Sequence, residues 1–140
     1  MIVVDTSGLI ALLDRGEPMH GAAHDAVAGA RGPLVVTDFV LAETDYLVLR
    51  RLGRRAEAAF IAQLVDGVFL REAVTDADLA RASDIIATFV DHDVGLTDAT
   101  LLAVAERLHT RRILSLDHRH LAVFRDRRGQ ALELVPAARR

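Results

Sequence analysis

Short apolar runs that end in an acidic residue occur near both ends of the chain. Ile2-Val3-Val4 leads straight into Asp5, and residues 8–13 then follow with helical character. Residues 112–117 repeat this theme as a short apolar strand that ends in Asp117. In a parallel sheet the carboxyl ends of the strands share one edge, where open α/β folds bind their ligands. We therefore expect the two aspartates to lie at that edge.

Helical and strand patterns alternate along the rest of the chain. Helices are expected over residues 20–30, 38–51, 55–65, a stretch behind an Asp76 cap that carries Leu79, Ala82, Ile85, Ile86 and Phe89, and a stretch from Thr97 to Leu108. Strands are expected over residues 33–37 and 68–74, and over an edge strand at 132–135 that Pro136 stops. This alternation predicts an α/β fold with helices on both faces of a parallel sheet.

Composition limits the class of protein. The chain has 140 residues, which fit one domain, and 51% of them are apolar, which indicates a folded globular protein. No apolar run approaches the roughly 20 residues that cross a bilayer, and the first residues do not resemble a signal peptide. Because cysteine is absent, disulfide and thiolate chemistry are excluded and a cytoplasmic location is expected.

Charge is distributed unevenly. Residues 1–106 hold 8 Arg against 17 acidic residues, whereas residues 107–140 hold 9 Arg against 3. A basic end on an acidic body suggests that a polyanion contacts one side of the molecule, although a solvated arginine-rich tail has the same composition. All 17 basic residues are arginine.

Several carboxylates are candidates for one site, and each also has a purely structural explanation. Asp5 can cap the following helix, Asp98 is favoured in a first helical turn, and Asp117 suits a turn. On the helix over residues 38–51, Glu43 and Asp45 both have apolar neighbours at helical spacing. The pattern therefore predicts that an acid on this helix enters the site without choosing between the two.

Converging carboxylates would repel one another and require a cation. No lysine is present to supply it, and oxygen ligands favour Mg²⁺ or Mn²⁺ over zinc. Such an ion suits phosphoryl chemistry, because it holds phosphate oxygens and lowers the pKa of a bound water that attacks in line. Serine hydrolase chemistry has no support, since no G-x-S-x-G motif occurs. A metal role for the His118-Arg119-His120 turn is not favoured over solvation or contact with phosphate.

The motifs resemble those of PIN-domain ribonucleases and, more narrowly, of VapC toxins from type II toxin–antitoxin systems. They are Asp5-Thr6-Ser7, Leu41-Ala42-Glu43-Thr44, Leu96-Thr97-Asp98-Ala99 and Ile113-Leu114-Ser115-Leu116-Asp117. The resemblance extends from Ile2 to about Val135. It implies a single PIN domain over residues 1–140, folded as a three-layer α/β/α sandwich on a mainly parallel sheet.

The resemblance also implies roles for individual residues. Asp5 and Asp98 would be the main Mg²⁺ or Mn²⁺ ligands, and Glu43 and Asp117 would complete the catalytic acids. Thr6 would support Asp5, and Ser115 would supply a hydroxyl beside the last acid. Within a basic border from Arg107 to Arg128, the candidates for contact with nucleic acid are Arg112, His118 and Arg119.

The implied activity is metal-dependent hydrolysis of structured RNA of the translation machinery, tRNA or rRNA, to 5′-phosphate and 3′-hydroxyl ends. The implied partners are the RNA, a second copy of the chain, and a VapB-like antitoxin whose C-terminal segment places an Arg in the acidic site. Receiver domains and haloacid-dehalogenase-like phosphatases also use acidic pockets, but they rely on a basic partner that is usually lysine. Because this chain contains no lysine, both families are disfavoured. The remaining alternative is a catalytically silent PIN-like module that binds RNA or a partner.

Overall fold

The computed structural model describes residues 1–137 and confirms the α/β prediction. Within these residues, five parallel strands form one sheet in the order β3-β2-β1-β4-β5. The strands are β1 (Ile2–Val4), β2 (Leu34–Thr37), β3 (Leu70–Glu72), β4 (Arg112–Leu114) and β5 (Glu133–Val135). As expected, β5 is an edge strand.

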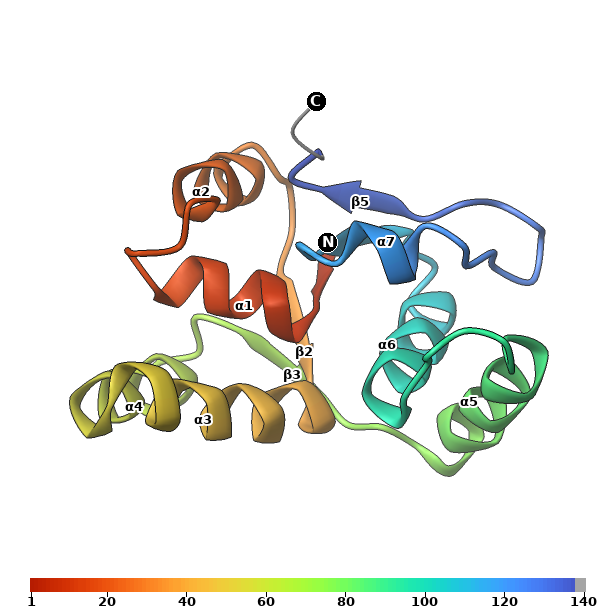
Figure 1. Cartoon of the computed structure of the whole chain (residues 1–140), viewed down its shortest axis with the longest axis horizontal. Coiled ribbons are helices and arrows are strands. Elements are labelled where there is room, and N and C mark those ends of the chain that lie inside the picture. The colour runs from red at the N-terminus through yellow and green to blue at the C-terminus, as the bar shows by residue number, and fades with distance from the viewer. Residues whose placement is uncertain (138–140) are drawn as a thin grey trace.

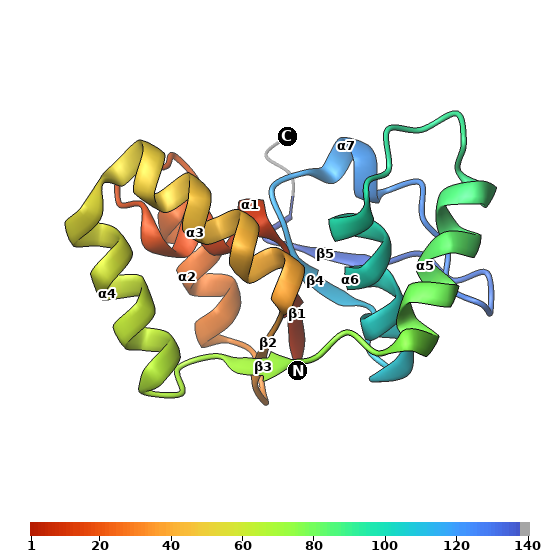
Figure 2. The ribbon, with the colours of Figure 1, turned by 90° about the horizontal axis from the view of Figure 1, so that it is seen from below.

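Helices flank the sheet on both sides. They are α1 (Thr6–Leu13), α2 (His20–Ala28), α3 (Asp38–Leu52), α4 (Arg54–Val65), α5 (Asp76–Thr88), α6 (Leu96–Arg107) and α7 (His118–Leu121). Figure 1 shows the whole chain. In Figure 2, α1 to α4 lie on the left and α5 and α6 on the right, with β1 and β2 between them. No helix within residues 1–137 is long and apolar enough to cross a membrane.

The strand β1 occupies the centre of the sheet. All three of its residues are fully buried, and it pairs with β2 on one side and β4 on the other. The chain moves outward from β1 to β2 and β3 and then returns to the opposite side for β4. Such a reversal leaves a crevice beyond the carboxyl ends of the central strands. In open α/β folds ligands bind at this edge, where β1 and β4 end.

Some local predictions were wrong at the ends of elements. The N-cap of α5 is Thr75, whose hydroxyl accepts from the Asp78 N–H while the Asp78 carboxylate accepts from the Thr75 N–H. This capping box makes Asp76 the first helical residue. Leu79 and Ile86, expected to pack inward, are more than a third exposed. The turn expected after Leu116 is the four-residue helix α7.

Candidate active site

Asp5 lies where β1 ends and α1 begins. It is 6% exposed, and its Oδ2 accepts hydrogen bonds from the hydroxyls of Ser7 at 2.6 Å and Ser115 at 2.8 Å. The Ser7 N–H also donates to this oxygen, so Asp5 is the N-cap of α1. Asp5 can therefore cap α1 and also take part in the site, because all three hydrogen bonds go to Oδ2 and none of them uses Oδ1.

Two serines connect the ends of β1 and β4. The hydroxyls of Ser7 and Ser115 lie 3.1 Å apart. The Ser7 hydroxyl accepts from the Leu116 N–H, and the Ser115 hydroxyl accepts from the Asp117 N–H, both at 2.9 Å. Ser7 was missed by sequence reasoning, since a hydroxyl beside a helix start cannot be told from an ordinary cap. These contacts hold Asp5 and Asp117 at one edge of the sheet.

Asp98 stands in the first turn of α6. Burial and the negative charges of Asp5, Asp117 and Glu43 together raise its pKa to about 6, while the hydrogen bond from the Gly95 N–H acts in the opposite direction. A carboxyl group responds in this way when it is partly desolvated beside like charges. The structure therefore brings all four predicted acids within electrostatic reach of one another.

Asp117 is the N-cap of α7 and is partly exposed. Its carboxylate accepts from the His120 N–H at 3.1 Å and contacts His120 Nδ1 at 2.7 Å. The hydrogen bond to Asp117 and its negative charge raise the pKa of His120. His120, which the sequence placed in a turn suited to solvation or contact with phosphate, is thus a direct neighbour of one of the acids.

Glu43 extends from α3 toward the site from an exposed position, although its apolar neighbours in the sequence suggested a buried one. The buried residues of α3 are Val40, Thr44 and Val48, and Glu43 itself is exposed. Its carboxylate accepts a hydrogen bond from the Thr6 hydroxyl. The Thr6 hydroxyl therefore donates to Glu43, whereas the resemblance had implied that Thr6 supports Asp5. The Asp45 side chain forms no hydrogen bond or ion pair within residues 1–137, and its charge is not among the causes of the raised pKa of Asp98.

The donor set suits a hard divalent cation. All four side chains offer carboxylate oxygen, and within residues 1–137 no arginine pairs with any of them. In the same part of the chain, no three His, Cys, Asp or Glu side chains are clustered closely enough to coordinate one ion. The charges of the four acids therefore affect one another, but among the described residues they do not form a closed set of ligands around one ion.

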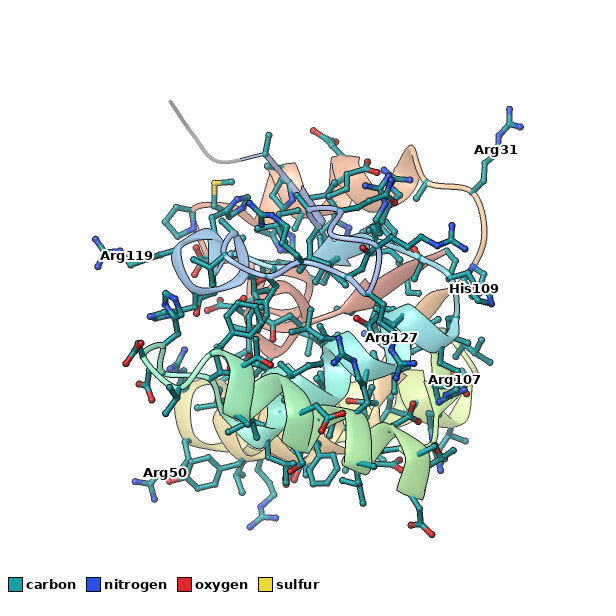
Figure 3. All side chains as sticks on the ribbon, turned by 90° about the vertical axis from the view of Figure 1, so that its right-hand side faces the viewer. Arg31, Arg50, Arg107, His109, Arg119 and Arg127 are labelled. Carbon is teal, nitrogen blue, oxygen red and sulfur yellow. The ribbon has the colours of Figure 1, made fainter. Side chains whose placement is uncertain are left out.

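The three candidates for contact with nucleic acid lie in different places. Arg112 begins β4, at the opposite end of the strand from Ser115, and pairs with Glu133 at 2.9 Å. His118 is partly buried, and its Nε2 has no hydrogen-bond partner among the described residues. Arg119 is exposed and projects from the molecule in Figure 3. Only His118 and Arg119 lie next to the acids.

The chain is similar to known nucleases along most of its length. Residues 2–126 match the PIN domain family. Ribonuclease VapC26 of Mycobacterium tuberculosis is 35% identical over 135 residues, which cover 96% of this chain and all of that protein. The 23S rRNA-specific endonuclease VapC20 of the same organism is 35% identical over 108 residues, 76% of this chain and 82% of its own.

Solved structures agree with this. The crystal structure of VapC20, described as a sarcin–ricin loop cleaving toxin, superimposes with a TM-score of 0.77 and 30% identity, and the match covers 84% of this chain and 90% of that one. A toxin–antitoxin complex from Klebsiella pneumoniae shares the fold, with a TM-score of 0.65 at 16% identity over 89% of this chain and 92% of that chain. The chain therefore belongs to the PIN domain family, as a homologue of the VapC ribonuclease toxins.

Proposed function

We propose that the protein is a Mg²⁺- or Mn²⁺-dependent endoribonuclease, the toxin of a VapBC-type pair, acting in the cytoplasm on structured RNA of the translation machinery. The observation that carries this proposal is the electrostatic coupling of Asp98 with Asp5, Asp117 and Glu43. Keeping four carboxylates together costs stability unless a cation or a polar ligand uses them. A module that had lost its cation would keep this repulsion between carboxylates without any benefit from it.

Asp5 and Asp98 would hold the cation. Asp5 is suited to this, because the two serine hydroxyls and the Ser7 N–H all bind its Oδ2 and none of these contacts involves Oδ1. When bound, the ion would neutralise phosphate oxygens and lower the pKa of a water ligand. Glu43 and Asp117 would complete the acidic site and orient water by hydrogen bonds. Hydrolysis of the phosphodiester would leave 5′-phosphate and 3′-hydroxyl ends.

The substrate class is inferred from the relatives. VapC20, similar in sequence and in structure, is named for specificity towards 23S rRNA. We infer rRNA or tRNA as the target, because both contain ordered single-stranded loops in which the phosphodiester backbone is accessible to a nuclease. His118 and Arg119 border Asp117 and would contact RNA phosphates there.

The proposed regulator is a VapB-like antitoxin. The Klebsiella neighbour is a toxin–antitoxin complex, which supports an assembly of this kind for the shared fold. Because no arginine of the described chain pairs with the four acids, an Arg from a partner's C-terminal segment would find an unneutralised site. Copurification of a small antitoxin-like protein with this chain, expressed from its native locus, would test this.

A homodimer is proposed as well. Leu79 and Ile86 lie seven residues apart on α5 and are 39% and 37% exposed, and Val90 beyond the helix is 77% exposed. Apolar side chains one heptad apart lie on the same face of a helix, and their burial against a second copy would be favourable. Sedimentation of the purified protein gives the oligomeric state.

The activity is tested by incubating purified protein with ribosomes and tRNA in the presence of Mg²⁺, Mn²⁺ or EDTA. We expect discrete cleavage that requires the ion, with ends open to a 5′-phosphate-dependent exonuclease. Asp98→Asn should abolish cleavage, and Asp25→Asn, the same change at an exposed position of α2, should not. If the wild-type protein cuts no RNA with either ion, the silent binding module is the correct alternative.

A further inference from the structure

A cavity of about 630 Å³ lies away from the catalytic carboxylates, at the opposite end of α6. Its walls come from α5, from the end of α6 and the turn after it, and from the loop between α7 and β5. Five arginines and three acidic residues line it: Arg81, Arg107, Arg111, Arg127, Arg128, Asp78, Glu106 and Asp126. Its size lies within the roughly 300–1,000 Å³ of ligand pockets.

Two of the three carboxylates that line this cavity, Asp78 and Glu106, are paired with arginines. Asp78 is 3% exposed and binds Arg107, which also binds Glu72 at 2.7 Å. Glu106 takes two hydrogen bonds from Arg81, at 2.8 and 2.9 Å. Paired in this way, the acids hold the arginines in place and leave little free negative charge on the wall.

Asp126 has a different role. Its Oδ1 accepts from the N–H groups of Arg128 and Gln130, at 2.9 and 2.8 Å, and so closes the turn of the loop. It forms no ion pair within the described chain. The turn presents the Arg128 side chain at the cavity.

Three cationic or ionisable side chains at the cavity have no carboxylate partner in residues 1–137. Arg111 donates only to the carbonyl of Ala131, and Arg128 and His109 form no side-chain hydrogen bond there. In Figure 3, His109, Arg107 and Arg127 lie together on one side of the view, and Arg119 projects from the other. Unpaired guanidinium groups at a hollow carry spare donors in the geometry that phosphate oxygens accept.

We propose that this cavity is a second phosphate-binding site, at which Arg111 and Arg128 hold the backbone of the RNA outside the cleavage site. The assignment to RNA rests on the proposed nuclease function. The acidic edge repels a polyanion, so affinity must come from positive charge elsewhere on the surface. Asp98 and Arg107 are nine residues apart on α6, about 14 Å along the axis, which a few nucleotides of RNA can span.

The test measures binding without cleavage. A fluorescein-labelled RNA hairpin is titrated in EDTA with wild-type protein and with the Arg111→Ala/Arg128→Ala double variant, over a series of salt concentrations. We expect about tenfold weaker binding by the variant and a salt slope reduced by about one to two phosphate contacts. The control is Arg31→Ala, an exposed arginine that points away from the molecule in Figure 3 and should bind as the wild type does.

A second arm separates RNA from a small phosphate ligand. Inorganic phosphate and AMP are titrated into the same proteins by calorimetry, and circular dichroism melts check that the variants are folded. Unchanged RNA binding by a folded double variant overturns the proposal, whether or not phosphate or AMP binds. Because binding is read without the metal ion, loss of RNA affinity in the variant supports the proposal even if the wild type proves unable to cut RNA.

Discussion

The hydroxyl of Ser115 donates to Oδ2 of Asp5 at 2.8 Å, although the two residues are 110 positions apart in the chain. Ser115 is fully buried, and its oxygen also accepts from the Asp117 N–H. One side chain therefore positions the first and the last of the candidate acids.

Ser115→Ala should lower RNA cleavage by roughly 10- to 100-fold, the usual cost of removing a hydrogen bond that orients a metal ligand. It should also lower the free energy of unfolding by about 1–2 kcal/mol, because the Asp117 N–H loses its acceptor and the buried Asp5 carboxylate loses one of its donors. Cleavage rates and urea unfolding measure the two effects. Ser83→Ala, on the exposed face of α5, is the matched control and should change neither. Equal cleavage by both variants would show that Ser115 does not position the acids.

Glu43 and Asp45 should differ in their effect on catalysis. Glu43 accepts from Thr6 and its charge helps raise the pKa of Asp98, whereas Asp45 does neither. We expect Glu43→Gln to reduce the cleavage rate by at least about tenfold, in the range of effects of groups that support a metal ligand, and Asp45→Asn to leave it unchanged. The rates are compared at saturating RNA and a fixed concentration of Mn²⁺. The reverse ranking would place Asp45 in the site instead.

Asp98 should make the metal-free protein less stable as the pH rises. Burial and the neighbouring acids raise the pKa of its carboxyl group from the ordinary value of 3.8 to about 6 in the folded protein. Between these values the folded state binds more protons than the unfolded state, so the free energy of unfolding falls with rising pH and stays low above pH 6. After allowance for solvent screening, the penalty at neutral pH is on the order of 1–2 kcal/mol.

The measurement is urea unfolding in EDTA at about pH 4 and about pH 7. Asp98→Asn should be more stable than the wild type at the higher pH and have no such advantage at the lower. Adding Mn²⁺ should stabilise the wild type at neutral pH and the variant much less, since binding to the folded state adds stability by mass action. If the difference in free energy of unfolding between Asp98→Asn and the wild type were the same at both pH values, the raised pKa of Asp98 would be contradicted.

Gly8 should tolerate no larger residue. A Cβ at this position of α1 would lie 2.6 Å from the carbonyl carbon of Leu114, the last residue of β4. Gly8→Ala should therefore cost about 2–3 kcal/mol, or displace α1 and with it Asp5. Gly21→Ala, on α2 with open space around it, should instead stabilise the protein by about 0.5–1 kcal/mol. Thermal melts of both variants, with cleavage assays, give the comparison.

The centre of the sheet and the aspartates at its edge could be predicted from the sequence, because β1, β2 and β4 each contain a short apolar run followed by a polar residue. Asp5 and Asp117 follow β1 and β4 closely, and these strands are parallel neighbours. The carboxyl ends of parallel strands lie at the same edge of the sheet, so an acid that follows each strand in the sequence is expected at that edge.

Other parts of the site depend on tertiary contacts that no local pattern contains. The apolar neighbours of Glu43 suggested a buried carboxylate, but the buried stripe of α3 runs through Val40, Thr44 and Val48. Helix α7 has four residues, too few for helical periodicity to appear. The partners of Ser7, at Ser115 and Leu116, lie more than a hundred positions away. The arginine-lined cavity likewise joins three separate segments.

The distribution of the four acids along the chain also determines when a ribosome could first release a harmful product. Asp5 meets Ser115 and Asp117 only after β4 has been synthesised and has docked beside β1. A nascent polypeptide that stops before this point lacks the Ser115 hydroxyl and the Asp117 carboxylate, which follow β4 in the chain. Under the proposed mechanism, a nascent chain would acquire its complete set of acids only in this late step of folding.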